Sequence, residues 1–140
     1  MSVEENKALI RRVYDLWNRR ELAAAFDLFD SSYVAHTTDR DMSLEEERKL
    51  DGEFFAAFPD ATGTIELMVA EGNKVAIRVT WRGTHKGEYA GIGPTGNRVE
   101  MTNSGIFRIA GGKVAELWAT LDNLRFMQQL GMTLNAPPTK

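Results

Sequence analysis

The stretch FRIAGGKVAELWATLDNLRFMQQLG, residues 107–131, holds the clearest structural pattern in this chain of 140 residues. A strand leads into a tight turn at Gly111-Gly112, and a second strand follows the turn. Asp122 then predicts the start of a short helix, because its side chain can accept a hydrogen bond from a free amide of the first turn. Gly131 predicts the end of that helix. The stretch therefore indicates a hairpin followed by a helix.

A two-residue period upstream of the hairpin predicts two further strands. Apolar and polar side chains alternate from residue 64 to 69, and Gly72-Asn73 forms a turn. After the turn, one strand face carries Val75, Ile77, Val79 and Trp81. In the next strand, one face carries Met101, Asn103, Gly105 and Phe107. Together with the hairpin these segments predict an antiparallel meander of about four strands.

Three helices are predicted before the strands. Ser2 and Ser43 each begin a capping-box pattern, in which a glutamate three residues later pairs with the serine. Apolar residues at four-residue spacing give the first helix a buried stripe, and Pro59 ends the third helix. The segment 31–42 is polar and predicts irregular structure, apart from a short extended piece at 33–34.

Helices followed by a run of strands predict an α+β fold. We expect a cone-shaped curved antiparallel sheet packed against three N-terminal helices, with a short C-terminal helix. The whole of residues 1–134 forms one domain in this interpretation, and residues 135–140, with two prolines, form a loose tail. Such a cone leaves a pocket between sheet and helices.

Composition excludes several classes of protein. The chain contains no cysteine, which excludes disulfides and thiolate chemistry and fits a reducing cytoplasm. The net charge is only −3 and no basic tract is present, so we expect no nucleic-acid partner. No apolar run has the length of a signal peptide or a membrane span, so we expect a cytoplasmic protein without a membrane partner.

Several motifs resemble one known family along nearly the whole chain. They are Trp17-Asn18, the run AAFPD at 56–60, the run THKGEYAGIGPTG at 84–96, and the run ELWA at 116–119. In these motifs the chain resembles the SnoaL-like polyketide cyclases, also called ester cyclases, of the nuclear-transport-factor-two-like superfamily. This resemblance implies cofactor-independent cyclisation or isomerisation of a small apolar, polyketide-like molecule, without a metal ion, as an isomerase or lyase.

The chain departs from the family where the proton is usually transferred. The family carries a carboxylate directly after the tryptophan of the ELWA run, and this chain has Ala119 there. Leu117 stands where a histidine is common, and Gly105 and Ala35 replace two further polar residues of the family. An alanine cannot abstract a proton, so any proton transfer needs another residue.

Two residues are candidates for that catalytic role. His36 follows Ala35, and the resemblance places it at the pocket mouth as a base or hydrogen-bond donor; it could equally be a surface-loop histidine. Asp122 is the nearest remaining carboxylate, but a helix N-cap explains it better. For His85 a structural role is favoured, and two histidines alone make no metal site.

The predicted substrate-binding residues are mainly large and apolar. They are Tyr14, Trp17, Phe54, Phe58, Trp81, Met101, Asn103, Phe107, Leu117 and Ala119. Asn103 is informative because a polar side chain on an apolar strand face needs a hydrogen-bond partner, either a ligand carbonyl or neighbouring backbone.

Two alternative functions remain open at this point. One is a non-catalytic small-molecule carrier, which the loss of the carboxylate favours. The other is an epoxide-opening or dehydrating relative, which needs a carboxylate pair or an Asp–Arg arrangement in the pocket. The resemblance also implies a homodimer or higher homo-oligomer, with the outer sheet face as interface. We expect that face to carry Arg78, Thr80, Arg82, Glu116 and Trp118.

Overall fold

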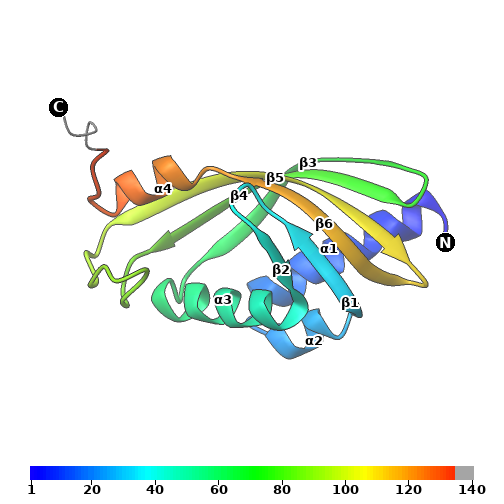
Figure 1. Cartoon of the computed structure of the whole chain (residues 1–140), viewed down its shortest axis with the longest axis horizontal. Helices are drawn as coiled ribbons and strands as arrows, with labels where there is room; N and C mark the ends of the chain where they lie inside the picture. Colours follow the sequence, from blue (N-terminus) through cyan, green and yellow to red (C-terminus); the bar gives the residue numbers. More distant parts are fainter. Residues whose placement is uncertain (135–140) are drawn as a thin grey trace.

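The computed structural model describes residues 1–134 and consists of one curved, six-stranded sheet with helices α1–α3 against one face (Figure 1). In chain order the elements are α1 (Val3–Asn18), α2 (Leu22–Phe26), β1 (Phe29–His36), β2 (Asp41–Ser43), α3 (Leu44–Ala57), β3 (Thr62–Glu71), β4 (Lys74–Thr84), β5 (Arg98–Ala110), β6 (Lys113–Leu121) and α4 (Asn123–Gln129). The α+β class is confirmed. The predicted tail at 135–140 lies outside the described residues.

The sheet is larger than the meander that the sequence predicts. Its strand order is β2-β1-β6-β5-β4-β3, and β1 runs parallel to β6 while the other neighbours are antiparallel. The segment 31–42 is therefore not irregular, because it supplies most of β1 and the start of β2. The register between β1 and β6 shifts between Phe29 and Val34, and Asp30 Oδ1 accepts from the Ser32 amide at 2.9 Å. This irregularity interrupts the alternation that would reveal the strand.

The predicted helix starts are confirmed in atomic detail. Ser2 Oγ accepts from the Glu5 amide at 3.1 Å, and Ser43 Oγ accepts from the Glu46 amide at 3.2 Å. Both glutamates also accept from the backbone amide of their serine, which completes each capping box. The box at Ser43 fixes where α3 begins and therefore which side chains of α3 face the sheet.

Arg20 ties the end of α1 to the segment that follows α3. Its backbone is left-handed, with φ of 63°, so the chain turns sharply after α1. Its guanidinium donates to the carbonyls of Pro59 at 2.7 Å and Ala61 at 2.5 Å, and it lies 4.6 Å from the centre of the Phe55 ring. These contacts hold both helices over the same part of the sheet.

The outer face of the sheet differs in one position from the expectation. Thr80 is buried, with its hydroxyl 3.2 Å from that of Thr102, and is not available to a partner. Four large apolar side chains are exposed there: Leu67 at 65%, Val69 at 67%, Ile106 at 43% and Trp118 at 38%. Self-association through this face stays a prediction.

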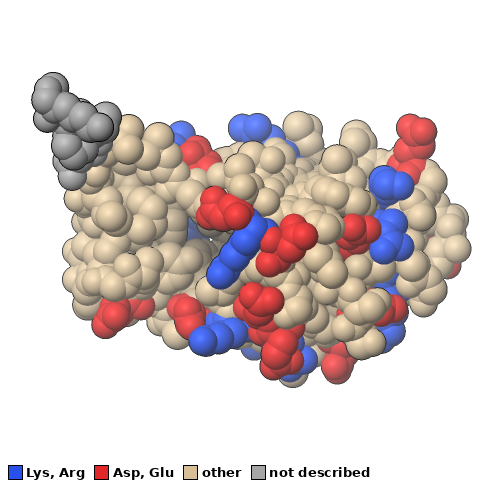
Figure 2. Space-filling view, in the orientation of Figure 1, with Lys and Arg blue, Asp and Glu red and all other residues tan. Residues whose placement is uncertain are grey.

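Charged side chains of both signs are interspersed on the face shown in Figure 2, and no basic patch is visible there. This agrees with the small net charge of the chain. Among the helices of residues 1–134, none combines the length and apolarity that a membrane crossing requires.

Candidate active site

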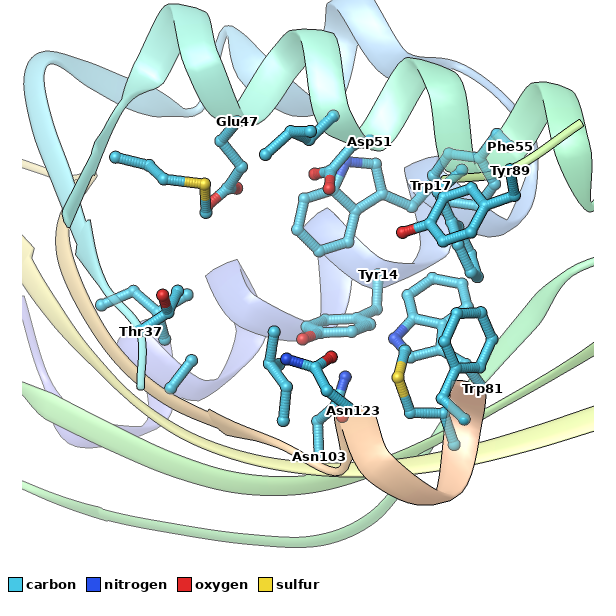
Figure 3. A pocket seen from close by; sticks show the side chains of 18 residues that line it. Tyr14, Trp17, Thr37, Glu47, Asp51, Phe55, Trp81, Tyr89, Asn103 and Asn123 are labelled. Carbon is cyan, nitrogen blue, oxygen red and sulfur yellow. The ribbon is translucent and has the colours of Figure 1, made fainter. Parts of the chain in front are cut away.

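A cavity of about 230 Å³ lies between the helices and the concave face of the sheet (Figure 3). Most of its wall is aromatic or aliphatic. It is lined by Tyr14, Trp17, Thr37, Met42, Glu47, Leu50, Asp51, Phe54, Phe55, Trp81, Tyr89, Met101, Asn103, Leu117, Ala119, Leu121, Asn123 and Phe126. The expected pocket between sheet and helices is therefore present.

The strand β6 faces the cavity as its alternation predicts. Leu117, Ala119 and Leu121 all line the cavity, because side chains two residues apart on a strand point to the same side. Gly105 pairs with Ala119 across the two strands. A methyl group on Gly105 would lie 3.0 Å from Leu117 Cδ1, so the leucine occupies space that a side chain at 105 would need.

Two carboxyl groups enter the cavity from α3, and the sequence analysis nominated neither. Glu47 and Asp51 are four residues apart, which places them one above the other on the same helix face. In Figure 3 both hang from α3 above the cavity, while Tyr14, Asn103 and Asn123 lie on the opposite side. The carboxyl pair therefore faces the position that a ligand would occupy.

Both carboxyl groups are shifted toward their protonated forms. Burial raises the pKa of Glu47 to about 7, although a hydrogen bond from the Tyr33 hydroxyl to Glu47 Oε1, 2.7 Å long, opposes this rise. Burial also raises the pKa of Asp51 well above 3.8, and the negative charge of Glu47 adds to the effect. Two interacting acids in such a place favour a state with one proton between them near neutral pH.

The pair has no cationic partner among residues 1–134. None of the ion pairs in this part of the chain involves Glu47 or Asp51, and no lysine, arginine or histidine lines the cavity. Buried carboxylates that serve structure alone are usually paired. Perturbed, unpaired acids in a cavity are candidates for catalysis.

Two polar atoms in the cavity wall also lack partners. Within the described chain, Trp17 Nε1 and Asn103 Oδ1 are buried and make no hydrogen bond. The backbone alternative for Asn103 is therefore not realised. Unsatisfied buried polar atoms cost free energy, so each is a place where a bound ligand can form a hydrogen bond.

Eight of the ten predicted binding residues line the cavity, and two do not. Phe58 and Phe107 are core residues, with exposed fractions of 0% and 1%. Phe58 follows α3 and stacks on His85, with 5.3 Å between ring centres. Neither borders the cavity in the structure, because hydrophobic alternation identifies the inward side of an element but not where the interior is hollow. Ligand contact by the other eight stays a prediction.

His36 lies outside the cavity. Ala35 and Thr37 point inward, so His36 points to the other face of β1. Its Nδ1 is 2.9 Å from Asp41 Oδ1 and its Nε2 is 2.6 Å from Glu116 Oε2, while Arg108 Nε donates to Glu116 Oε1. Hydrogen bonds to these carboxylates raise the pKa of His36 above 6.5, because the imidazolium can donate to both.

This cluster predicts a pH dependence of stability. Since the folded pKa of His36 is raised, its contribution is present below pH 6.5 and is lost as pH rises through the folded value. Hydrogen bonds from His36 and Arg108 lower the pKa of Glu116, so the glutamate contributes above pH 4.5 and loses its contribution as pH falls through the folded pKa. Urea unfolding between pH 4.5 and 9 should show this loss on the alkaline side. In His36→Gln the loss should be smaller by the contribution of His36, while the loss caused by the buried carboxyl groups of Glu47 and Asp51 remains. A profile that the substitution leaves unchanged would refute the assignment.

Asp122 and His85 both have structural surroundings. Asp122 Oδ1 accepts from the Arg125 amide at 3.3 Å, so the carboxylate caps α4, and it does not line the cavity. His85 is fully buried, and its Nδ1 accepts from the Thr95 amide at 3.2 Å, which anchors the loop between β4 and β5. Within residues 1–134 there is no group of three or more acidic or histidine side chains that could hold a metal ion.

A signal for the carboxyl pair does exist in the sequence. Glu47 and Asp51 interleave with Leu50 and Phe54 at helical spacing, so all four belong to one helix face. An acid inside an apolar stripe must be buried or border a cavity. The pattern is hard to recognise because the solvated Glu45 and Glu46 directly precede Glu47, so that Glu47 looks like part of a charged, exposed run.

Comparison with known proteins agrees with this architecture. The profile of the SnoaL-like polyketide cyclase family matches residues 7–130. Among solved structures, AclR from Streptomyces galilaeus, which is called a hydroxylase, is 32% identical with a TM-score of 0.88, over 93% of this chain and 98% of AclR. IdmH from Streptomyces antibioticus, which is called a polyketide cyclase, is 29% identical with a TM-score of 0.79, over 91% of this chain and 99% of IdmH. A search of curated proteins gives no significant match.

The family profile covers most of the domain, and the two solved structures align along nearly their full length. Together these matches assign the family of the chain. The chain belongs to the SnoaL-like polyketide cyclase family.

Proposed function

We propose that this protein is an enzyme that cyclises or isomerises a small, largely apolar, polyketide-like molecule by proton transfer through Glu47 and Asp51. The observation that carries this proposal is the unpaired carboxyl pair in an aromatic cavity, with raised pKa values at both members. The pair supplies the acid–base group that Ala119 cannot supply. Family membership supports the substrate class.

The proposed reaction divides the two proton transfers between the pair. The ionised carboxylate removes a proton from a carbon next to a carbonyl, and the resulting enolate carbon attacks a second carbonyl in the same molecule. The protonated carboxyl then gives its proton to the oxygen of that second carbonyl. One carbon–carbon bond forms, no atom is lost, and the pair again holds one proton. Tyr33 favours Glu47 as the base, because its hydroxyl stabilises the ionised form.

Cavity size restricts the substrate. Pockets for drug-sized ligands are roughly 300–1,000 Å³, and this cavity of about 230 Å³ lies below that range. We therefore propose a flat substrate of two or three rings. Trp81 and Phe54 would lie beside its faces. Trp17 Nε1 would donate to a ligand oxygen, and Asn103 Oδ1 would accept from a ligand hydroxyl.

The proposal predicts an unusual dependence of turnover on pH. The base must be ionised, so turnover should fall as pH drops through about 7, the raised pKa of Glu47. On the alkaline side it should fall again when Asp51 loses the proton that the acid step requires. The measurement is the turnover rate of purified protein between pH 5 and 10 on a panel of bicyclic and tricyclic diketones. An acidic limb near pH 4.5, typical of a solvated carboxylate, would contradict the proposal.

The same pair also supports a second function, dehydration or epoxide opening. Dehydration needs a base for a carbon-bound proton and an acid for the departing hydroxyl, and a pair with one proton holds both. The mass of the product separates these reactions: cyclisation leaves it unchanged, dehydration removes one water, and the hydroxylation suggested by the description of AclR adds one oxygen. Native mass spectrometry that finds a bound and unaltered ligand would instead favour a carrier.

A further inference from the structure

The cavity combines aromatic rings with acidic side chains, and no lysine, arginine or histidine of residues 1–134 lines it. Its wall includes the rings of Tyr14, Trp17, Phe54, Phe55, Trp81, Tyr89 and Phe126. Rings of this set lie close together, for example Phe54 and Trp81 with 5.9 Å between centres. Glu47 and Asp51 are the ionisable acids of the wall, and their charges are not balanced by any cation among residues 1–134.

Two further side chains indicate that the cavity is built to receive a ligand. Trp17 is 6% exposed and its Nε1 has no hydrogen-bond partner in residues 1–134. Tyr14 is 7% exposed and presents its ring and hydroxyl to the same cavity. Both line the cavity, and Figure 3 shows them beside the space under Asp51. Polar groups buried to this degree normally have partners.

We propose that this cavity binds flat arylalkyl amines, in which an aliphatic amino group is attached to an aromatic ring system, in their protonated, positively charged form. An ammonium group is attracted to aromatic faces and forms strong hydrogen bonds with carboxylates. Here it would meet both at once and would provide the countercharge that the pair lacks. This inference uses the cavity of the proposed function but not its chemistry, because binding of an amine requires no turnover.

The groups around the pair determine how binding depends on pH. Tyr14 from α1, Tyr33 from β1 and Tyr89 from the loop after β4 face the pair, and burial raises the pKa of each, so all three stay neutral. A cation favours the ionised pair, and its binding therefore releases protons. Affinity for an amine should increase as pH rises from 6 to 8.5, through the pKa of Glu47 at about 7.

The test compares three ligands that differ in one group. Naphthylmethylamine is positively charged, naphthylmethanol has nearly the same shape but is neutral, and naphthoate is negatively charged. Calorimetry at pH 8 should show the amine binding about tenfold or more tighter than the alcohol, with naphthoate weakest. Equal affinity of amine and alcohol, or tightest binding of naphthoate, would overturn the inference.

Variants test whether Glu47 and Asp51 cause the preference for the amine. In the Glu47→Gln, Asp51→Asn double variant the preference for the amine over the alcohol should disappear, while in Glu45→Gln, an exposed position on the same helix, it should persist. A preference that survives in a folded double variant would refute the site. If that variant does not fold, the pH dependence in the natural protein decides, because a site without the pair would not gain affinity between pH 6 and 8.5. Loss of turnover without amine selectivity would refute this inference and leave the proposed function intact.

Discussion

Asp51→Asn and Glu47→Gln should each lower turnover by roughly 100- to 10,000-fold, which is the usual contribution of a general acid or base. Each substitution keeps the shape of the side chain and removes its ability to exchange a proton. The measurement is the turnover rate at pH 7.5 on the substrate that the panel identifies, with ligand affinity determined separately. Affinity for a neutral ligand should change little, because the cavity wall is otherwise preserved.

Two controls make this result specific. Glu45→Gln changes the same chemical group at an exposed position of α3 and should retain full turnover. The His36→Ala, Asp122→Asn double variant removes the two catalytic candidates of the sequence analysis, and it should also retain turnover because neither side chain lines the cavity. Full activity in both carboxyl variants, or loss of activity in a folded double control, would contradict the assignment.

Glu47→Gln, the variant expected to lose turnover, should also stabilise the protein above neutral pH. A carboxyl group whose pKa rises on folding, here from 4.5 to about 7, binds its proton more tightly in the folded state, so stability falls as pH rises between these values. A glutamine has no such proton to lose. At pH 8 the gain in the free energy of unfolding should be on the order of 3 kcal/mol. Lower activity with higher stability would indicate that the pair is retained for function.

Phe58→Ala should lower the free energy of unfolding by about 3–5 kcal/mol, and Tm by roughly 10–20 °C. Phe58 is fully buried and packs against the rings of Phe54, His85, Tyr89 and Phe126, so its removal leaves a void inside the core. The measurement is thermal and urea unfolding of the purified variant.

The matched control for this prediction is Phe54→Ala. Phe54 borders the cavity and is only partly buried, so the same truncation enlarges an existing space and should destabilise the protein less. Ligand affinity should respond in the opposite order, with the larger loss in Phe54→Ala. A Phe58→Ala variant that is as stable as the natural protein would show that this ring belongs to the pocket after all.

Local patterns predicted much of the fold because their causes are local. The capping boxes at Ser2 and Ser43, the cap at Asp122 and the turn at Gly111-Gly112 depend only on neighbouring residues, and the structure has all of them. Two-residue alternation likewise grouped Leu117 and Ala119 on one side of β6, and both line the cavity. Of strand β1 only the short piece at 33–34 was predicted, because its partner β6 lies about 80 residues away and its own register is interrupted.

The residues of the candidate site could also be predicted only in part from local patterns. Eight of the ten predicted binding residues line the cavity, since apolar periodicity marks the inward side of each element. His36 was expected at the pocket mouth, but its side chain points to the outer face of the sheet, because neighbouring residues on β1 point to opposite faces. There it contacts Asp41 of β2 and Glu116 of β6. Glu47 and Asp51 were missed because whether an acid on a helix meets water or a cavity depends on what packs opposite.

By itself, the sequence determined the α+β class, the family, the helix starts and the absence of a carboxylate at position 119, because these follow from residue identity and short-range spacing. Only the tertiary structure decided where the interior stays hollow and which acids enter it. A cavity is the space left when distant elements fail to fill the core, and the raised pKa of Glu47 follows from that enclosure. Neither property belongs to any single stretch of chain.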